Sequence, residues 1–278
     1  MRAVIVVDAS IVVAAQMGSG AALDIFVKAL QRPIYNLARR MLASHSEAED
    51  ATQEILILAV TRLSQVREPG AAGGWVLKLA IRHLSRTRRQ SAVEAMRFTT
   101  TSFAADVETG LADLPDTAVV DPERAILENE VKIGCTIALL TCLSRPLRAT
   151  YILGEIYELT DEQMARALEI TPAAARQRLR RARAIIENFT RNHCGIVSSL
   201  AACTCERRVA RALETGRIGS SHDEAEARHG MPLSQVNAAI SALEVGRRTT
   251  ALMQSNQQFD TSIAERVIAA LDIDARMS

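Results

Sequence analysis

The clearest structural signal in this chain is LTDEQMARALEITPAAARQRLRRAR, which runs from Leu159 to Arg183. Thr160 and Gln163 have the spacing of a capping box, in which each side chain binds the backbone N–H of the other, and they predict the start of a short helix. Thr171 and Pro172 predict a second helix start, an N-cap residue followed by proline at the first helical position. A short helix, a brief turn and a second helix make a helix-turn-helix pattern.

The second of these helices carries its charge on one side only. Its apolar positions recur at i, i+4, i+7 and i+11, which are Ala175, Leu179, Ala182 and Ile186. With that stripe buried, a helix of about 100° per residue turns most of its arginines to the opposite side. Five arginines and no acidic residue lie between Thr171 and Arg183, and such a helix fits the major groove of DNA. The predicted DNA contacts are Thr171, Ala173, Arg176, Gln177, Arg178, Arg180 and Arg181. The alternative is a charged helix face that only meets solvent.

Composition limits the fold class and excludes several kinds of protein. At roughly 150 residues per domain, the 278 residues indicate two domains with room for a small third. Aromatic residues make up only 3% of the chain, which favours small helical bundles over sandwiches or barrels. A formal net charge of +1 excludes a uniformly basic nucleic-acid binder but allows local basic patches. Five cysteines, an odd number in a long chain, do not make a disulfide scaffold.

We therefore predict an all-α protein with two small helical domains joined by an acidic linker, plus a helical C-terminal extension. The predicted segments are an N-terminal extension (1–20), a first domain (21–97), the linker (98–123), the helix-turn-helix domain (124–193) and the C-terminal extension (194–278). We expect an extended linker, because Pro115 and Pro122 interrupt any helix there.

The apolar N-terminus resembles a signal peptide but is interrupted by Asp8. We expect a loose extension or a start codon assigned too far upstream, with a secretory signal as the alternative. No other segment is long and apolar enough to cross a membrane, so we expect a cytoplasmic protein with no membrane partner.

The first domain has an acidic face and a basic run. Ser46 and Glu49 predict a second capping box at the start of an apolar helix. Glu47, Asp50 and Glu54 lie at i, i+3 and i+7 of that helix and so share one face. A catalytic or metal-binding carboxylate cluster is one interpretation, although no His or Cys accompanies it. The basic run closes the next predicted helix with Arg82, Arg86, Arg88 and Arg89. A charge run alone usually faces water, but beside a helix-turn-helix it suggests a second DNA-contacting module.

Three segments, in this order, resemble the extracytoplasmic-function sigma factors of bacterial RNA polymerase. SEAEDATQEILILAVTRLSQV (Ser46–Val66) is similar to the helix that these factors lay against the polymerase clamp. GWVLKLAIRHLSRTRR (Gly74–Arg89) is similar to their −10-reading helix, and Leu159–Arg183 to their −35-reading helix-turn-helix. The resemblance covers about residues 22–192 and implies two helical domains that polymerase holds apart on a promoter.

The resemblance also implies roles for single residues. Polymerase contacts would come from Glu47, Asp50, Gln53 and Glu54. Around the −10 element, His83 would reach a base and the neighbouring arginines would hold phosphates: Arg82, Arg86, Arg88 and Arg89. Two positions depart from the family, because Glu169 stands where glycine is usual in the turn and Arg82 where asparagine is common. The promoter sequence is therefore not readable from the chain.

The C-terminal extension opens with a cluster of metal-ligand types. Three thiols and an imidazole fall within thirteen residues, and we predict a structural zinc site there. The predicted ligands are His193, Cys194, Cys203 and Cys205. A redox disulfide, for instance between Cys194 and Cys203, and ordinary buried cysteines are the alternatives. Cys135 and Cys142 lie seven positions apart and are expected in the core.

We interpret the chain as an alternative sigma factor that binds core RNA polymerase, recognises −10 and −35 elements and promotes transcription initiation. It would have no active site and require no cofactor, and its C-terminal extension would tune its activity; an anti-sigma factor is a further candidate partner. One alternative is a stand-alone helix-turn-helix regulator with a C-terminal sensing domain. Another is a metal-dependent enzyme that uses the carboxylates of residues 47–54 or the cysteine cluster.

Overall fold

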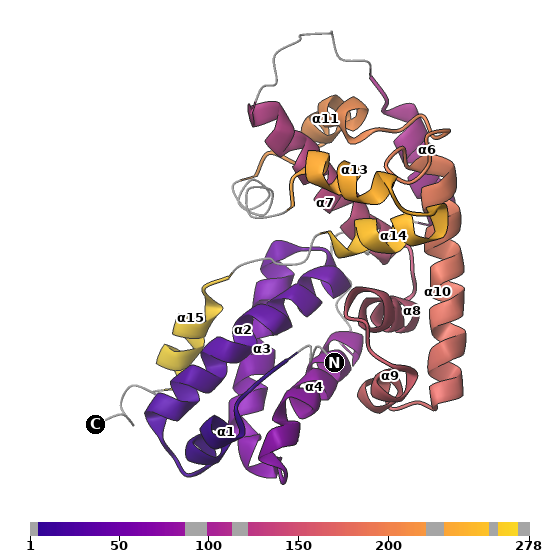
Figure 1. The fold of residues 1–278 in the computed structure, drawn as a ribbon. Coiled ribbons are helices and arrows are strands. Elements are labelled where there is room, and N and C mark those ends of the chain that lie inside the picture. Colours follow the sequence, from indigo (N-terminus) through magenta and orange to yellow (C-terminus); the bar gives the residue numbers. More distant parts are fainter. Residues whose placement is uncertain (1–4, 87–98, 113–121, 221–230, 256–260, 272–278) are drawn as a thin grey trace. The chain divides into compact units, whose positions relative to one another are not determined.

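The computed structural model describes residues 5–86, 99–112, 122–220, 231–255 and 261–271 (Figure 1). Every regular element in these ranges is a helix, which confirms the all-α prediction. None of the described helices is both long and apolar enough to span a membrane. The chain forms two compact units, the first from residues 1–92, 152–177 and 260–278 and the second from 93–151 and 178–259. Each unit draws on several of the predicted segments, and the boundaries of those segments stay predictions.

Three packed helices form the centre of the first unit. They are α2 (Gly20–Leu42), α3 (His45–Thr61) and α4 (Ala72–Arg86), and each contacts the other two (Figure 1). Two short 3-10 helices, η1 (Leu63–Gln65) and η2 (Pro69–Ala71), connect α3 to α4. Each of the three helices contributes fully buried apolar side chains, namely Phe26, Leu30, Ile34, Ile55, Leu56, Val76 and Leu84. Burial of each such side chain stabilises the fold by roughly 1.5–3 kcal/mol.

The N-terminal residues are not a loose extension, so that prediction is wrong for the part that the structure describes. They form helix α1 (Ala9–Gln16), which packs on α2. Asp8 is its N-cap and accepts the N–H of Ser10 at 2.7 Å, so the residue that interrupts the apolar run starts the helix. Val12 is fully buried, and the Gln16 side chain donates to the Leu63 carbonyl at 3.0 Å. Within the described part of this apolar run, Ile5, Val12 and Ala15 are buried.

Helix α3 begins slightly earlier than predicted, and the capping box predicted at Ser46 is wrong. Its N-cap is Ser44, whose hydroxyl accepts the N–H of Glu47 at 3.4 Å. The shift follows from the end of α2, where Ala43 adopts the left-handed conformation with φ 62°. That turn places Ser44 in the extended conformation that an N-cap residue requires.

The first unit also includes segments from much later in the chain. The first is η3 (Ile152–Ile156), which is a single π-helical turn. The others are α9 (Asp161–Leu168), α15 (Ile263–Ala270) and the first six residues of α10, 172–177. Helix α9 packs on α4, and α15 packs on α2 and α3. The buried Arg40 guanidinium of α2 lies 5.9 Å from the centre of the Tyr157 ring. This cation–π contact attaches the segment after η3 to α2.

The second unit contains most of helix α10 (Pro172–His193), from residue 178 onward. Its other helices are α6 (Thr100–Thr109), α7 (Pro122–Thr141), α8 (Arg145–Tyr151), α11 (Cys205–Glu214), α13 (Leu233–Ser241) and α14 (Val245–Gln254). Helix α7 contacts both α11 and α13. One apolar cluster joins Val131 to Val209, Ala212 and Ile218. A second joins Val197, Val236, Ile240 and Leu252. The first cluster therefore packs the C-terminal extension on α7, whereas the four residues of the second all belong to the extension itself.

The first part of the predicted extended linker is helical, which corrects that prediction. Helix α6 begins with a capping box between Thr99 and Ser102. Phe103 is buried on this helix, and its ring stacks on Phe189 at a centroid distance of 5.1 Å. An apolar face that packs on α10 favours helix over an extended tether. Pro115 lies outside the described residues.

Candidate nucleic-acid interface

Helices α9 and α10 start as the sequence predicts. The Thr160 hydroxyl accepts the N–H of Gln163 at 3.3 Å, and the Gln163 carbonyl oxygen Oε1 accepts the N–H of Thr160 at 2.9 Å, which confirms the capping box. The Thr171 hydroxyl accepts the N–H of Ala174 at 3.2 Å and caps α10. Both caps depend only on residues three positions apart, so the motif is determined locally.

Glu169 ends α9 in the left-handed conformation, with φ 55° and ψ 45°. Glycine is the residue that adopts this conformation most easily, so glutamate here is held against its preference. Its carboxylate lies 2.9 Å from the Lys78 ammonium on α4. The hydrogen bond from Lys78 and the nearby charges of Arg82 and Arg86 lower the pKa of Glu169. The ion pair thus joins the turn of the motif to α4, although both side chains are exposed and such a pair contributes little to stability.

The outer face of α10 presents arginines to solvent. Ala175, Ala182 and Ile186 are completely buried and Leu179 is 5% exposed, as the spacing predicted. The exposed predicted contacts are Thr171, Ala173, Arg176, Gln177, Arg180 and Arg181, and Arg178 is half-buried. Arg176 lies 3.2 Å from the Asp161 carboxylate, but both side chains are solvent-accessible and such pairs contribute little. The geometric condition for a groove-binding helix is therefore met.

Helix α4 presents a smaller basic surface. Arg82 and Arg86 are exposed, whereas Arg88 and Arg89 lie outside the described residues. His83 is half-buried, and its Nε2 lies 3.1 Å from the Glu54 carboxylate on α3. The structure thus brings together a side chain predicted to contact DNA and one predicted to contact polymerase.

Helix α3 keeps its acidic face accessible. Among the predicted polymerase contacts, Asp50 and Glu54 are exposed, and Glu47 and Gln53 are half-buried. On the adjacent face, the Glu49 carboxylate lies 3.2 Å from the Arg266 guanidinium of α15. The C-terminal helix therefore lies next to the acidic face.

Similarity to known proteins identifies the family. Residues 26–93 match the family described as Sigma-70 region 2. The chain is 29% identical over 185 residues to the RNA polymerase sigma-H factor of Pseudomonas aeruginosa, covering 65% of this chain and 92% of that relative. It is 25% identical over 162 residues to the ECF RNA polymerase sigma factor SigE of Mycolicibacterium smegmatis, covering 58% of each protein. The chain belongs to the extracytoplasmic-function sigma factors.

The region 2 match of this sigma factor contains α3, α4 and most of α2. Both the acidic face and the basic surface of α4 therefore lie within the part that resembles region 2. The helix-turn-helix and the C-terminal extension lie beyond residue 93, outside that match. Their interpretation depends on the geometry described above.

The structure gives one predicted metal ligand a different partner. His193 Nδ1 lies 3.1 Å from the Glu108 carboxylate of α6, and its ring is 5.0 Å from that of Phe189. Cys194, Cys203 and Cys205 are free and half-buried. As the described side chains stand, no three or more His, Cys, Asp or Glu residues surround a common metal position. The zinc prediction stays a prediction.

Cys135 and Cys142, which the sequence placed in the core, both lie on α7 or at its end and are half-buried. Burial raises the pKa of both thiols above their ordinary value.

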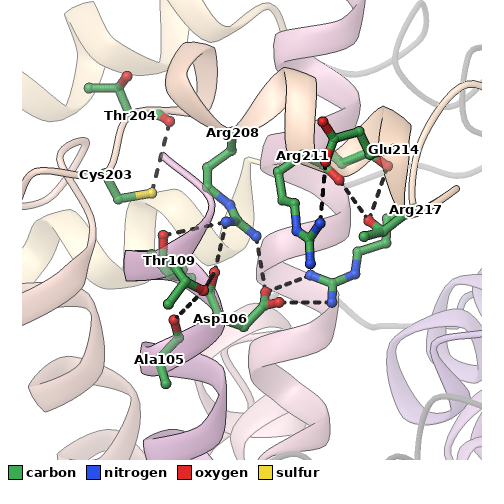
Figure 2. A network of polar contacts seen from close by, with 12 residues as sticks. Ala105, Asp106, Thr109, Cys203, Thr204, Arg208, Arg211, Glu214 and Arg217 are labelled. Carbon is green, nitrogen blue, oxygen red and sulfur yellow. Dashed lines mark hydrogen bonds and ion pairs between the residues drawn. The ribbon is translucent and has the colours of Figure 1, made fainter. Parts of the chain in front are cut away.

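A polar network fixes α11 of the C-terminal extension on α6 (Figure 2). The Asp106 carboxylate accepts hydrogen bonds from Arg208 at 3.0 Å and from Arg217 at 2.9 Å. Arg208 also donates to the backbone carbonyl of Asp106 at 2.8 Å. Only 17% of the Asp106 side chain and 8% of the Arg208 side chain are exposed. The hydrogen bond from Arg217, followed by the positive charges of both arginines, lowers the pKa of Asp106.

Proposed function

We propose that this sigma factor binds core RNA polymerase and directs it to promoters by reading the −35 element with α10 and the −10 element with α4. The observation that carries the proposal is the outer face of α10. Its apolar stripe is buried, its arginines are exposed, and it has no carboxylate between Pro172 and Arg183. The first turns of such a helix reach base edges in the major groove, and the later arginines bind phosphates.

The acidic face of α3 is the proposed polymerase contact. Asp50 and Glu54 are exposed on it and available to basic side chains of polymerase. Contact with polymerase would compete with the pair between Glu54 and His83 and so release His83 toward DNA. In this proposal the chain acts in the cytoplasm beside polymerase and supplies no active site of its own.

Promoter affinity of the reconstituted holoenzyme, measured over a range of salt concentrations, tests the role of α10. Loss of one phosphate contact in Arg180→Ala should weaken binding and reduce the slope of log affinity against log salt by about 1. The matched control is Arg191→Ala, because Arg191 is exposed on the last turn of the same helix. Equal slopes for Arg180→Ala and the wild type would contradict the proposal. Tight duplex binding without polymerase would favour the stand-alone regulator.

We also propose that the C-terminal extension restricts access to polymerase, in place of a separate anti-sigma factor. Helix α15 packs on α2 and α3, and the N–H of Ala264 donates to the Gln31 side chain at 2.7 Å. Val267 is fully buried, so this helix is docked rather than tethered. Arg266 reaches Glu49 at 3.2 Å, beside Asp50. A helix held there limits the approach of polymerase to the acidic face.

A chain that ends at residue 260 tests this regulatory role. It should bind core polymerase more tightly than the full chain and give more run-off transcript. Arg266→Ala should have a smaller effect of up to about fivefold, because its pair with Glu49 is partly exposed and such pairs contribute less than about 1 kcal/mol. The control is Arg247→Ala, an exposed arginine on α14. Unchanged polymerase affinity in the shortened chain would refute the role.

A further inference from the structure

The N-terminal segment of this sigma factor, residues 5–17, lies against the connection between α3 and α4. Helix α1 packs on α2 and also contacts η1 and η2, the two short helices of that connection. Ile5, Val12 and Ala15 are buried, so the segment packs as part of the first unit. It therefore meets a stretch of chain about fifty positions further along.

Gln16 binds the connection at the end of η1. Its side-chain amide Nε2 donates to the carbonyl of Leu63 at 3.0 Å and to the carbonyl of Val66 at 2.8 Å. A primary amide has two N–H groups, so Gln16 provides one for each carbonyl. Val66 is the C-cap of η1, and carbonyls at a helix end need donors from outside the helix. Gln16 therefore ties the end of η1 to α1.

The segment makes a second, independent contact at the first turn of α4. The Ile5 carbonyl approaches the backbone of Gly73 so closely that a Cβ at this position would clash with its oxygen. Glycine leaves the room that this approach needs. Alanine forms helices more readily than glycine, so the contact with Ile5 accounts for glycine here better than helix formation does. The segment thus contacts both the connection and the helix that follows it.

The connection has little burial of its own. It runs from residue 62 to residue 71, between the end of α3 and the start of α4, and its two buried residues are Leu63 and Val66. Its exposed residues are Arg62, Ser64, Gln65, Arg67, Glu68, Gly70 and Ala71. A stretch with few buried apolar contacts opens easily unless other parts of the chain hold it. The contacts from Gln16 and Ile5 supply such a hold.

We propose that residues 5–17 hold the connection between α3 and α4 in place, with Gln16 as the positioning residue, and so orient α4 for the −10 element. The inference rests on the proposed function, in which polymerase binds the acidic face of α3 while α4 reads DNA. A holoenzyme bound through α3 can open the promoter only if α4 keeps a fixed orientation relative to α3. The N-terminal segment then acts through α4 and touches neither DNA nor polymerase.

Two substitutions in the full-length chain test the proposal. Gln16→Glu replaces both donors with a carboxylate that repels the carbonyl oxygens of Leu63 and Val66, and Gly73→Ala places a Cβ where the Ile5 carbonyl lies. Each should reduce opening of the −10 region by the holoenzyme, measured by permanganate reactivity, about fivefold, the equivalent of two neutral hydrogen bonds. The double variant should lose less than the product of the two effects, because both act through one segment.

Two further readouts separate positioning from general loss of structure. Affinity for core polymerase should not change, because Asp50 and Glu54 lie about two helical turns or more from the end of α3. Trp75, the single tryptophan of the chain, lies half-buried in the first turn of α4, so acrylamide should quench its fluorescence more strongly in both variants. Val13→Ala is the matched control, because Val13 is an exposed residue of α1. It should match the wild type in every assay.

Several results would overturn the proposal. One is a loss of polymerase affinity as large as the loss of promoter opening, since that would show a merely structural role; another is wild-type quenching of Trp75 in both variants. Arg86→Ala, on the basic surface of α4, distinguishes this inference from the proposed function. Opening that falls in Arg86→Ala but in neither Gln16→Glu nor Gly73→Ala overturns the inference alone. Unchanged opening in Arg86→Ala overturns both. Circular dichroism of each variant reports whether it folds.

Discussion

Asp106→Asn should loosen the attachment of α11 to α6 without unfolding the rest of the protein. The substitution keeps the shape of the side chain but removes the negative charge that Arg208 and Arg217 share. Arg208 then keeps a buried guanidinium whose acceptors are all uncharged, namely the backbone carbonyls of Asp106 and Val107 and the amide oxygen of the new side chain. The perturbation therefore acts on one network, drawn in Figure 2.

The expected loss of stability depends on how deeply each arginine is buried. Removing one partner of a buried ion pair costs roughly 3–5 kcal/mol, and the Arg208 side chain is only 8% exposed. The bonds of Arg208 to backbone carbonyls remain and reduce this cost to about 2–3 kcal/mol. Arg217 is 37% exposed, so its pair adds less than about 1 kcal/mol. We expect a total of about 3 kcal/mol, or roughly a hundredfold in the local opening equilibrium.

Amide hydrogen exchange in α6 and α11 measures this local opening. Protection in both helices should fall about a hundredfold in Asp106→Asn, whereas α2 and α3 keep theirs. Glu214→Gln is the control, because the exposed pair of Arg211 and Glu214 on α11 contributes little. If protection falls by less than threefold, or equally in the control, the network does not hold α11 in place.

The same network predicts a pH dependence. Because the pKa of Asp106 is lowered in the folded state, its stabilising contribution is complete above the ordinary value of 3.8 and is lost as the pH falls through the folded pKa. The difference in protection between the wild type and Asp106→Asn should therefore be constant near neutral pH and shrink below about pH 4. A difference that persists at lower pH would show that the charge is not the cause.

Three further substitutions test local features of the fold. Ala43→Gly should raise the unfolding free energy by up to about 1 kcal/mol, measured by urea denaturation, because Ala43 holds a left-handed φ of 62° that glycine adopts without strain. Thr160→Ala should lower it by about 1 kcal/mol in the same assay, since it removes the N-cap of α9. Lys132→Met should raise stability at pH 7, because burial lowers the pKa of Lys132 to about 8 and disfavours its charged form when folded. The wild type should approach the stability of this variant as the pH rises from 8 toward 10.5, and a constant difference over that range would refute the explanation.

Local signals in the sequence predicted the parts of the fold that depend on neighbouring residues. The start of α9 needs only Thr160 and Gln163, and the burial of Leu179 follows from a regular helical period. The capping box expected at Ser46 failed because two overlapping serine signals compete there. The left-handed Ala43 at the end of α2, which selects Ser44, was not evident from the sequence.

Contacts between distant residues could not be predicted in this way. Asp106 and Arg208 are 102 positions apart, and nothing in either neighbourhood indicates that they meet. The helical character of α6 depends on packing of Phe103 against Phe189, which outweighs the polar composition of the segment. The exposed charges of α10, by contrast, were predictable because solvent contact follows from the period of one helix.

The ion pair between Lys78 and Glu169 joins α4 to the turn of the helix-turn-helix, so in the described arrangement the two lie side by side. Two elements centred at −35 and −10 lie about 25 base pairs apart, or roughly 85 Å along the duplex. In the proposed function α4 and α10 read these two elements, and a helix and a turn joined at 2.9 Å cannot span that interval, so the proposal requires this pair to open first. Salt screens this exposed pair and favours opening, yet it also weakens arginine–phosphate contacts. Initiation should therefore be fastest at an intermediate ionic strength.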